Sequence, residues 1–363
     1  MITSPTLLLD KRKCLKNIES MAAKAKRNGI IFRPHFKTHQ SLEVGRWFKD
    51  FGVDKITVSS MQMAAYFATD GWNDITVAFP VNVLEHELIS ELGSKITLNI
   101  QVESADAVHL LAQKVRTPLQ VYIKIDVGTQ RTGIPFSDFG RIDDTLNSIK
   151  EYAHFQFCGF ITHTGHSYQA RSSEEVMNIH LKSMDFINQL KDIYVPQYPN
   201  LILSTGDTPT CSVADDFLEI DEIRPGNFVF YDWMQHIIGA CHFDQIAMVM
   251  ACPVVAIHPN RQEFVVHGGA VHLSKDFIFK TDGSRDYGRI VSLANNGWSS
   301  PWEQSYVTAL SQEHGIIRTT SELLKQIKVG DLIGIVPIHS CLSVSAMRTY
   351  LTLEGKSIQC MGY

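Results

Sequence analysis

The sequence lacks any long hydrophobic segment and any block of basic residues. No uninterrupted apolar run approaches the ~20 residues that a membrane-spanning helix needs, and residues 1–10 hold too short an apolar run for a signal peptide. Lysines and arginines are scattered along a chain of net charge -5, so no basic stretch can follow the phosphates of a nucleic acid. We therefore expect a cytoplasmic protein with no membrane or nucleic-acid partner.

The cysteines lack a regular pattern. They are odd in number, irregularly spaced and without a C-x-x-C pair, which makes a disulfide framework unexpected. We expect free thiols, one of which could be a metal ligand. The seven positions are Cys14, Cys158, Cys211, Cys241, Cys252, Cys341 and Cys360.

What the chain does have is an alternation of β-rich runs and helical periodicity between about residues 30 and 232. This alternation is typical of βα units, and eight strands favour closure into an α/β fold of the (β/α)8 TIM-barrel type. The predicted strands are 30–34, 55–59, 74–79, 95–102, 119–126, 155–162, 200–204 and 227–231. The predicted helices are 11–28, 42–51, 61–69, 83–92, 105–115, 139–152 and 174–193.

The pattern changes after residue 232. Short strands at 254–257, 263–266, 305–310, 332–336 and 349–353 predict a mostly antiparallel β domain. A lone strand at 5–9 precedes the first helix and could pair into it. The predicted division is a barrel over 11–239 and a β domain over 1–10 plus 240–363.

Residues 30–39 form an apolar run that ends in ionisable groups, with Lys37 where a buried strand should surface. Burial of an ammonium costs several kcal/mol, so such a lysine is usually paired, neutralised or covalently used. A lysine of lowered pKa can form a Schiff base with a carbonyl, including that of pyridoxal phosphate. The alternative is a surface lysine in a basic loop.

Other polar clusters follow later barrel strands, at the end where TIM barrels bind ligands. They occupy 126–133, 163–168 and 204–210. The third loop combines a glycine with hydroxyls and a helix start, which together can bind a phosphate. Tyr231, near the predicted eighth strand, is a second candidate phosphate contact. The alternative for each loop is an ordinary turn.

A second chemical signal is His339 with Cys341. If this segment is a strand, positions i and i+2 point to the same face, so both side chains could bind one metal. Imidazole with thiolate suits Zn²⁺. The alternative is a core cysteine beside a polar turn.

Residues 34–39, 205–210, 224–227, 230–232 and 337–341 together resemble the D-threonine aldolase and D-serine dehydratase family. The resemblance implies a pyridoxal phosphate enzyme with an alanine-racemase type barrel and a C-terminal β domain. It also implies a homodimer. By the resemblance, Lys37 binds the cofactor and acts in catalysis, and His339 and Cys341 bind the metal. The further residues that it implies near the cofactor are Arg131, His166 (also a catalytic candidate), Tyr168, Thr205, Gly206, Asp207, Thr208 and Tyr231.

The metal ligands separate two activities within the family. Members resembling the aldolase tend to have His-x-Asp with Mn²⁺ or Mg²⁺, whereas those resembling the dehydratase have His-x-Cys with zinc. Cys341 therefore favours Zn²⁺ and a dehydratase that converts a D-3-hydroxy amino acid to a 2-oxo acid and ammonia. The first alternative is aldol cleavage to glycine and an aldehyde, with His163 or His166 as base. A racemase is disfavoured because it needs a second acid/base across the cofactor and no metal. A non-catalytic cofactor carrier would need only the barrel and Lys37, and a metal-only barrel hydrolase would usually have more His and Asp ligands at strand ends.

One segment departs from the expected pattern. Residues 267–276 carry extra histidine and lysine where a plainer glycine turn is expected.

Overall fold

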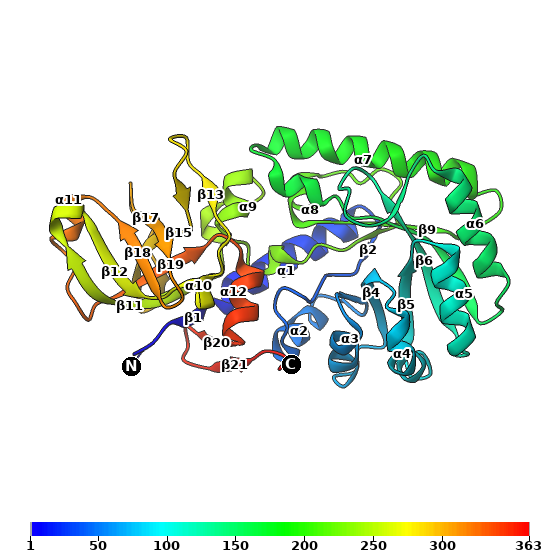
Figure 1. Cartoon of the computed structure of the whole chain (residues 1–363), viewed down its shortest axis with the longest axis horizontal. Helices are drawn as coiled ribbons and strands as arrows, with labels where there is room; N and C mark the ends of the chain where they lie inside the picture. Colours follow the sequence, from blue (N-terminus) through cyan, green and yellow to red (C-terminus); the bar gives the residue numbers. More distant parts are fainter. Residues whose placement is uncertain (1, 363) are drawn as a thin grey trace.

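Eight short parallel strands form a barrel in the computed structural model, which describes residues 2–362 (Figure 1). Their order is β2-β10-β9-β8-β6-β5-β4-β3, and a parallel bridge between His35 and Thr57 joins the two ends of this path. The predicted barrel is confirmed. The strands are β2 (Ile31–Phe32), β3 (Ile56–Val58), β4 (Asp74–Pro80), β5 (Thr97–Val102), β6 (Leu119–Asp126), β8 (Phe155–Ile161), β9 (Ile202–Thr205) and β10 (Glu222–Ile223). A short strand β7 (Ile134–Pro135) pairs with β6.

Helices between these strands cover the outside of the barrel, close to their predicted ranges (Figure 1). The first helix ends at a glycine, Gly29, whose φ of 66° suits a helix C-terminus, and Ile30 N–H donates to Ala25 O behind it. The helices are α1 (Lys11–Arg27), α2 (Leu42–Lys49), α3 (Met61–Ala68), α4 (His86–Gly93), α5 (Ala105–Lys114), α6 (Phe139–Lys150) and α7 (Ser173–Tyr194). A shorter helix, α8 (Thr208–Val213), follows β9.

The eighth strand was predicted in the wrong place. Residues 227–231 hold a 3₁₀ turn, η3 (Asn227–Val229), and the strand is β10, two residues long. Pro225 ends it, because proline has no N–H to donate to a strand ladder. The carbonyl of Pro225 instead accepts from His35 N–H at 2.8 Å. This hydrogen bond joins the end of β10 to the loop that carries Lys37, called the lysine loop below.

The second sheet also closes on itself. Its order runs β12-β18-β17-β15-β19-β11, and β11 pairs back with β12, so six antiparallel strands complete a small barrel. The strands are β11 (Met248–His258), β12 (Glu263–His267), β15 (Gly288–Ala294), β17 (Tyr306–Leu310), β18 (His314–Arg318) and β19 (Leu332–Pro337). Smaller pieces are β13 (Ile278–Phe279), β14 (Arg285–Asp286), β16 (Gly297–Trp298), α9 (Trp233–Ile238), α10 (Ala270–Leu273), α11 (Ser321–Leu324) and α12 (Ser340–Met347).

The amino-terminal strand belongs to this second sheet. β1 (Thr6–Leu9) pairs antiparallel with β11 and parallel with β20 (Thr349–Thr352), which pairs in turn with β21 (Ser357–Gln359). The predicted pairing of the first strand into the β domain is therefore confirmed. The barrel is thus inserted between the first strand of the β domain and the rest of it.

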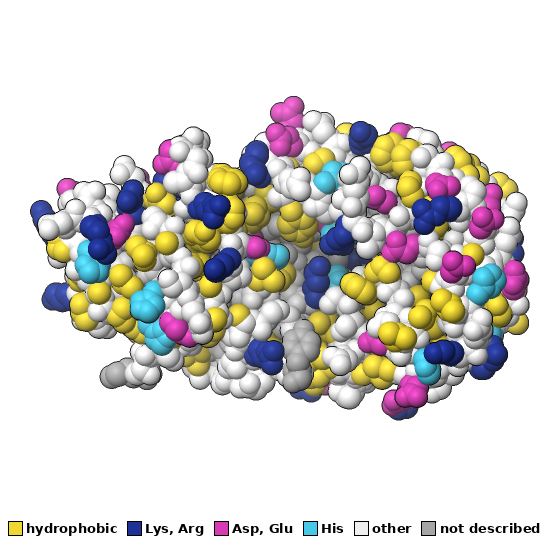
Figure 2. All heavy atoms as spheres, in the orientation of Figure 1, with side chains coloured by type: hydrophobic (Ala, Val, Ile, Leu, Met, Phe, Trp, Pro, Cys, Tyr) yellow, Lys and Arg dark blue, Asp and Glu magenta, His cyan; other side chains and the backbone are white. Residues whose placement is uncertain are grey.

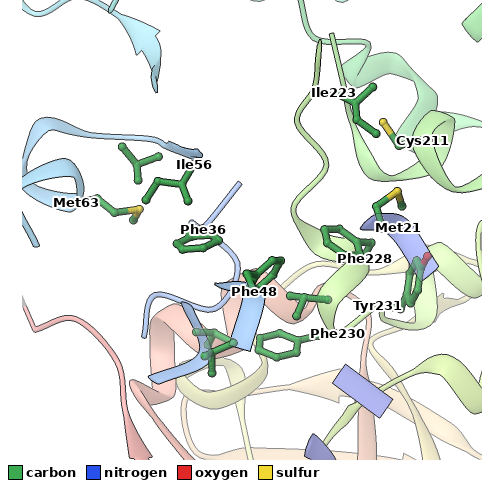
Figure 3. Close-up of a cluster of buried hydrophobic side chains, with 14 of the residues drawn as sticks. Met21, Phe36, Phe48, Ile56, Met63, Cys211, Ile223, Phe228, Phe230 and Tyr231 are labelled. Atoms are coloured by element: carbon green, nitrogen blue, oxygen red, sulfur yellow. The ribbon is translucent and has the colours of Figure 1, made fainter. Parts of the chain in front are cut away.

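Aromatic side chains fill the space beneath the lysine loop. Phe36 packs on Phe48 with ring centroids 4.9 Å apart, and Phe48 lies edge-on to Phe228 at 6.2 Å. Figure 3 shows these rings together with Phe230, which comes from the segment that leads toward the β domain. These packed rings support the loop that carries Lys37.

The β domain holds the same loop from the other side. Tyr350 Oη donates to His39 O at 2.7 Å, Met361 N–H donates to Gln40 O at 2.6 Å, and Gln40 Nε2 donates to Ser345 Oγ at 2.8 Å. Gln40 has a φ of 50°, a left-handed conformation that these contacts stabilise. The lysine loop is therefore clamped between the two domains.

Two expectations from composition can be compared with the structure. Over residues 2–362 no helix has the length and apolar character needed to cross a membrane. All seven cysteines are free, so the expected absence of a disulfide framework is confirmed.

Candidate active site

A cavity of about 480 Å³ lies at the mouth of the barrel and reaches the β domain. Figure 2 shows it as a hollow between the two halves of the molecule, with Lys or Arg side chains at its edge. Seven of the predicted site residues line it: Lys37, Arg131, Tyr168, Gly206, Asp207, His339 and Cys341. Residues from four barrel loops and from one segment of the β domain thus meet at one place.

Lys37 opens to this cavity from the loop after β2. Protein nonetheless surrounds its amine, and this burial is the main cause that lowers the pKa of Lys37. The thiol of Cys341 acts in the opposite direction, and Arg131 adds to the lowering. A lysine whose pKa is lowered has more of its neutral amine at neutral pH, which is the form that attacks a carbonyl or accepts a proton.

Two histidines flank the lysine, and both are kept neutral. Burial, with the nearby Lys37 and other cations, lowers the pKa of His35 and of His163 well below the usual value. His163 Nδ1 lies 3.0 Å from Gly206 O, a pure acceptor, so Nδ1 carries the ring proton. Its Nε2 is then the unprotonated nitrogen, free to accept a proton.

The loop after β9 contains the predicted glycine and leads into a helix, α8. One of its predicted cofactor contacts, Asp207, hydrogen-bonds within the protein. Asp207 is the N-cap of α8: its carboxylate accepts from Thr210 N–H and from Ser167 Oγ, both at 2.8 Å. Burial raises the pKa of Asp207 to about 6. Gly206 has a φ of 141°, and a Cβ there would lie 2.5 Å from Arg224 N, so only glycine fits.

Four predicted residues do not line the cavity. Tyr231 Oη lies 3.1 Å from Ser212 Oγ, and its ring packs beside Met21 in the buried cluster (Figure 3). Thr208 Oγ1 accepts from Phe228 N–H at 3.2 Å, while Thr205 is buried without a partner for Oγ1 within residues 2–362. His166 Nδ1 lies 3.3 Å from Thr129 Oγ1, and His163 takes the position on the cavity wall.

Two basic residues that the sequence did not single out as site residues also line the cavity. Arg224 is 4% exposed and donates to Ser204 Oγ and to Thr162 O. Lys124, on β6, is 5% exposed, and burial together with Arg224 and Arg131 lowers its pKa well below the usual value. The signal for Lys124 was present: in Leu119–Asp126 polar and apolar residues alternate, and a barrel strand turns alternate residues inward.

Arg224 is held by a polar network that continues into the barrel. Ser204 Oγ donates to Glu222 Oε1, and Glu222 Oε2 accepts from Arg33 Nε at 2.6 Å. Arg33 also pairs with Asp74 at 2.6 Å. Buried charges of this kind are stable only when paired, so the network fixes the guanidinium of Arg224 at the cavity wall.

His339 and Cys341 lie together, but the reason given from sequence was wrong. The strand β19 ends at Pro337, His339 is the N-cap of α12, and Cys341 lies in the first turn of that helix. The i, i+2 argument for a strand therefore does not apply; Pro337 cannot donate to a strand ladder, and the chain turns into a helix. Proximity comes instead from the tight turn at the helix start.

The two side chains affect each other strongly. Burial lowers the pKa of His339, but the thiolate of Cys341 and the carboxylate of Asp276 outweigh it and raise this pKa to about 11. Burial likewise opposes ionisation of Cys341, yet His339 and Lys37 lower the pKa of the thiol. The thiol is thus predisposed to the thiolate form that binds a metal.

Partners around this pair orient it as a metal site requires. His339 Nδ1 lies 2.9 Å from Asp276 Oδ2, which leaves Nε2 as the atom that a metal would bind in place of the Nε2 proton. Cys341 Sγ lies 3.2 Å from Thr38 Oγ1, the neighbour of Lys37. Asn227 Nδ2 donates to Ser340 Oγ at 2.9 Å and holds the start of α12. No sequence pattern pointed to Asp276 as a partner of His339, because 63 positions separate the two residues.

The residues present fit an anionic aldehyde cofactor and a soft divalent metal. Lys37, Lys124, Arg131 and Arg224 line the cavity, and the carboxylate of Asp207 is occupied by its capping donors. A cavity of this size can hold a phosphorylated ring and a small amino acid. The Oδ1 atom of Asn227, also on the wall, has no donor within residues 2–362 and can accept one from a ligand.

Comparison with known proteins gives matches over both domains. The family model for the N-terminal domain of alanine racemase matches residues 9–232, and the model for a putative serine dehydratase domain matches residues 247–353. D-serine dehydratase of Dictyostelium discoideum is 27% identical over 98% of this chain and 94% of its own. D-threo-3-hydroxyaspartate dehydratase of Delftia sp. is 25% identical over 98% and 95%. The solved structure of the latter aligns with a TM-score of 0.90 and 22% identity, over 100% of this chain and 99% of that one.

Proposed function

The chain belongs to the family of the alanine racemase N-terminal domain, and from this premise we propose that it is a pyridoxal phosphate-dependent lyase. The proposed reaction eliminates water from a D-3-hydroxy amino acid, and one water molecule then hydrolyses the resulting enamine to a 2-oxo acid and ammonia. The D-configured hydroxy amino acid is proposed by analogy with the dehydratases that align over both domains. A cytoplasmic location and a homodimer remain predictions from the sequence.

One observation carries the proposal. Lys37 and the pair His339 and Cys341 line the same cavity although more than 300 positions separate Lys37 from Cys341 in the chain; the contact from Thr38 to Cys341 spans 303. A racemase or a simple cofactor carrier has no use for a thiolate and an imidazole at this point. Loss of a hydroxyl does, because hydroxide is a poor leaving group without an acid or a metal.

Lys37 is proposed to hold the cofactor aldehyde and, once released by the substrate amine, to accept the proton from the α-carbon. Pyridoxal phosphate, when bound, supplies an electron sink for the charge left on that carbon. The lowered pKa of Lys37, caused by burial, favours the neutral amine that this role requires. Arg224 and Arg131, which both line the cavity, are placed to balance the negative charge of a phosphorylated ligand.

His339 and Cys341 are proposed to hold a Zn²⁺ ion, with Mn²⁺ or Mg²⁺ as less suitable alternatives for a thiolate. Such an ion would supply Lewis-acid assistance to the departure of the β-hydroxyl. Asp276 would keep His339 in the tautomer that presents Nε2. Small side chains nearby, Ser59 and Ala78, leave space for a short substrate side chain.

The test is a product assay on the purified protein loaded with pyridoxal phosphate. D-serine, D-threonine and D-3-hydroxyaspartate are supplied with and without a chelator, and 2-oxo acid, ammonia, glycine and aldehyde are measured. We expect 2-oxo acid and ammonia in equal amounts, lost on chelation and restored by Zn²⁺. Failure of all three substrates with cofactor and metal both bound would overturn the proposal.

Aldol cleavage is the second candidate, favoured by a specific observation: His163 presents an unprotonated Nε2 to the cavity. Such a base could take the proton of a β-hydroxyl and so break the bond between the α- and β-carbons. Glycine with an aldehyde in the same assay would select this reaction. His163→Gln should then reduce cleavage while leaving cofactor absorbance unchanged.

A further inference from the structure

A second cluster of metal-ligand side chains lies in the β domain and consists of His267, His272 and Glu313. Each offers one ligand atom, and these atoms all lie within 4.8 Å of one another. His267 and His272 belong to the segment 267–276, the one stretch whose histidines the family resemblance did not explain. The proposed reaction uses none of the three.

The distances suit one ion. Nε2 of His267 lies 3.3 Å from Glu313 Oε2, and Nε2 of His272 lies 3.6 Å from the same oxygen. Tetrahedral zinc with bonds of about 2.0–2.1 Å places its ligand atoms about 3.3 Å apart. Two imidazoles and one carboxylate are a zinc set that leaves one position for water.

The backbone, rather than the side chains, brings the three residues together. Glycines allow the segment after His267 to lie directly on the turn that carries Glu313: a Cβ at Gly269 would be 2.3 Å from Gln312 O. Three successive hydrogen bonds then hold the two segments in register, from the N–H groups of Gly268, Ala270 and Val271 to the carbonyls of Glu313, Ser311 and Gln312, at 2.9, 2.8 and 3.2 Å.

The side chains are available for binding. The carboxylate of Glu313 is 48% exposed and the ring of His272 is 15% exposed, so an ion can enter from solvent while one ligand stays sheltered. Burial, with His267 nearby, lowers the pKa of His272 against the opposing effect of Glu313.

One contact competes with an ion. Gly269 N–H donates to His272 Nδ1 at 3.1 Å, so the neutral ring carries its proton on Nε2. Binding through Nε2 moves that proton to Nδ1 and breaks this hydrogen bond. Ion binding at this site therefore costs one hydrogen bond, a cost that is absent at His339, because Asp276 is placed to accept from Nδ1 of His339.

We propose that His267, His272 and Glu313 form a second divalent-metal site, suited to Zn²⁺ and separate from the active site. An ion there ties together the end of β12, the helix α10 and the β17–β18 turn. The same segment continues to Asp276, so the ion also stiffens the support of His339.

The test is the zinc content of cofactor-loaded protein, measured by mass spectrometry of the metal after equilibration with micromolar Zn²⁺. We expect two zinc ions per wild-type chain, one in the His267→Ala/His272→Ala variant and one in Cys341→Ala. The control His258→Ala, in the same sheet but outside the cluster, should keep two. Glu313→Gln, at an exposed position that does not threaten folding, should weaken the second ion at least tenfold.

The outcomes separate this proposal from the proposed function. Unchanged zinc content in both the double-histidine and Glu313→Gln variants would overturn the second site, whatever happens at Cys341. Zinc that persists in Cys341→Ala but disappears in the double-histidine variant would support the second site and contradict the proposed catalytic metal. No zinc in wild-type protein would overturn both.

Discussion

The two walls of the active-site cavity differ in chemistry. The barrel wall presents Lys37, Lys124 and Arg224, whose pKa values are all lowered mainly by burial. The β-domain wall presents the thiol of Cys341, whose pKa is lowered by His339 and Lys37 despite its burial, next to His339, which Asp276 orients. One wall is suited to an anion and the other to a metal cation. The proposed reaction needs groups from both walls in one cavity.

The largest effect should come from the barrel wall. Lys37→Ala should reduce turnover by at least about 10⁴-fold, because it removes both the attachment point of the cofactor and the proton acceptor. Lys37→Arg, which keeps the positive charge, should be equally inactive. The measurement is borohydride reduction followed by peptide mapping, which should find the cofactor on Lys37 in wild-type protein only. A labelled peptide in either variant would contradict the assignment.

Removing the thiolate tests whether the walls act separately. Cys341→Ala should lower turnover by about 10²- to 10⁴-fold, since the Lewis acid is worth several kcal/mol. Cofactor absorbance and its affinity should stay within twofold of wild type, as titration with pyridoxal phosphate would show. Loss of the cofactor together with the metal would mean that the two walls form a single binding unit.

A smaller effect is expected from Asp276, which contacts the proposed metal ligand His339 but is not itself proposed as a ligand. Asp276→Asn removes the carboxylate that fixes His339 and should weaken zinc binding by about 10- to 100-fold. Turnover should recover at high Zn²⁺. The matched control is Asp282→Asn, an exposed carboxylate in the loop that follows. A loss of turnover that excess zinc does not restore would show that Asp276 acts on the substrate.

The smallest predicted effect concerns His39, which lies among the aromatic side chains beneath the loop that carries Lys37. Burial lowers the pKa of His39 to about 3, so below pH 6.5 the unfolded chain binds a proton that the folded chain does not. The free energy of unfolding should therefore fall by about 1.4 kcal/mol per pH unit from this residue as the pH drops from 6 to 4. His39→Phe, among Phe36, Phe48 and Phe67, should reduce that slope. Equal slopes for both proteins in urea unfolding would contradict this origin.

The sequence predicted the regular part of the molecule well, because hydrophobic periodicity decides where long helices and strands form. It misplaced the last barrel strand. That strand, β10, has only two residues, which are too few to show an alternation of apolar and polar side chains. It paired His339 with Cys341 correctly but for a strand that is in fact a helix start. Arg224 lies in one of the motifs that carry the resemblance, but its place on the cavity wall, like the contact of Asp276 with His339, depends on distant segments and is not readable from a local pattern.

The insertion of the barrel into the β domain has a consequence for synthesis on the ribosome. β1 precedes the barrel in the chain but pairs with β11 and β20, which follow it, so every barrel strand leaves the ribosome before β1 can meet its partners. The contacts from Tyr350 and Met361 to the loop of Lys37 need a still later part of the chain. A nascent chain that stalls before Tyr350 therefore carries a barrel whose lysine loop is not anchored. We therefore expect firm cofactor binding by Lys37 to require the segment 350–361 as well as the barrel.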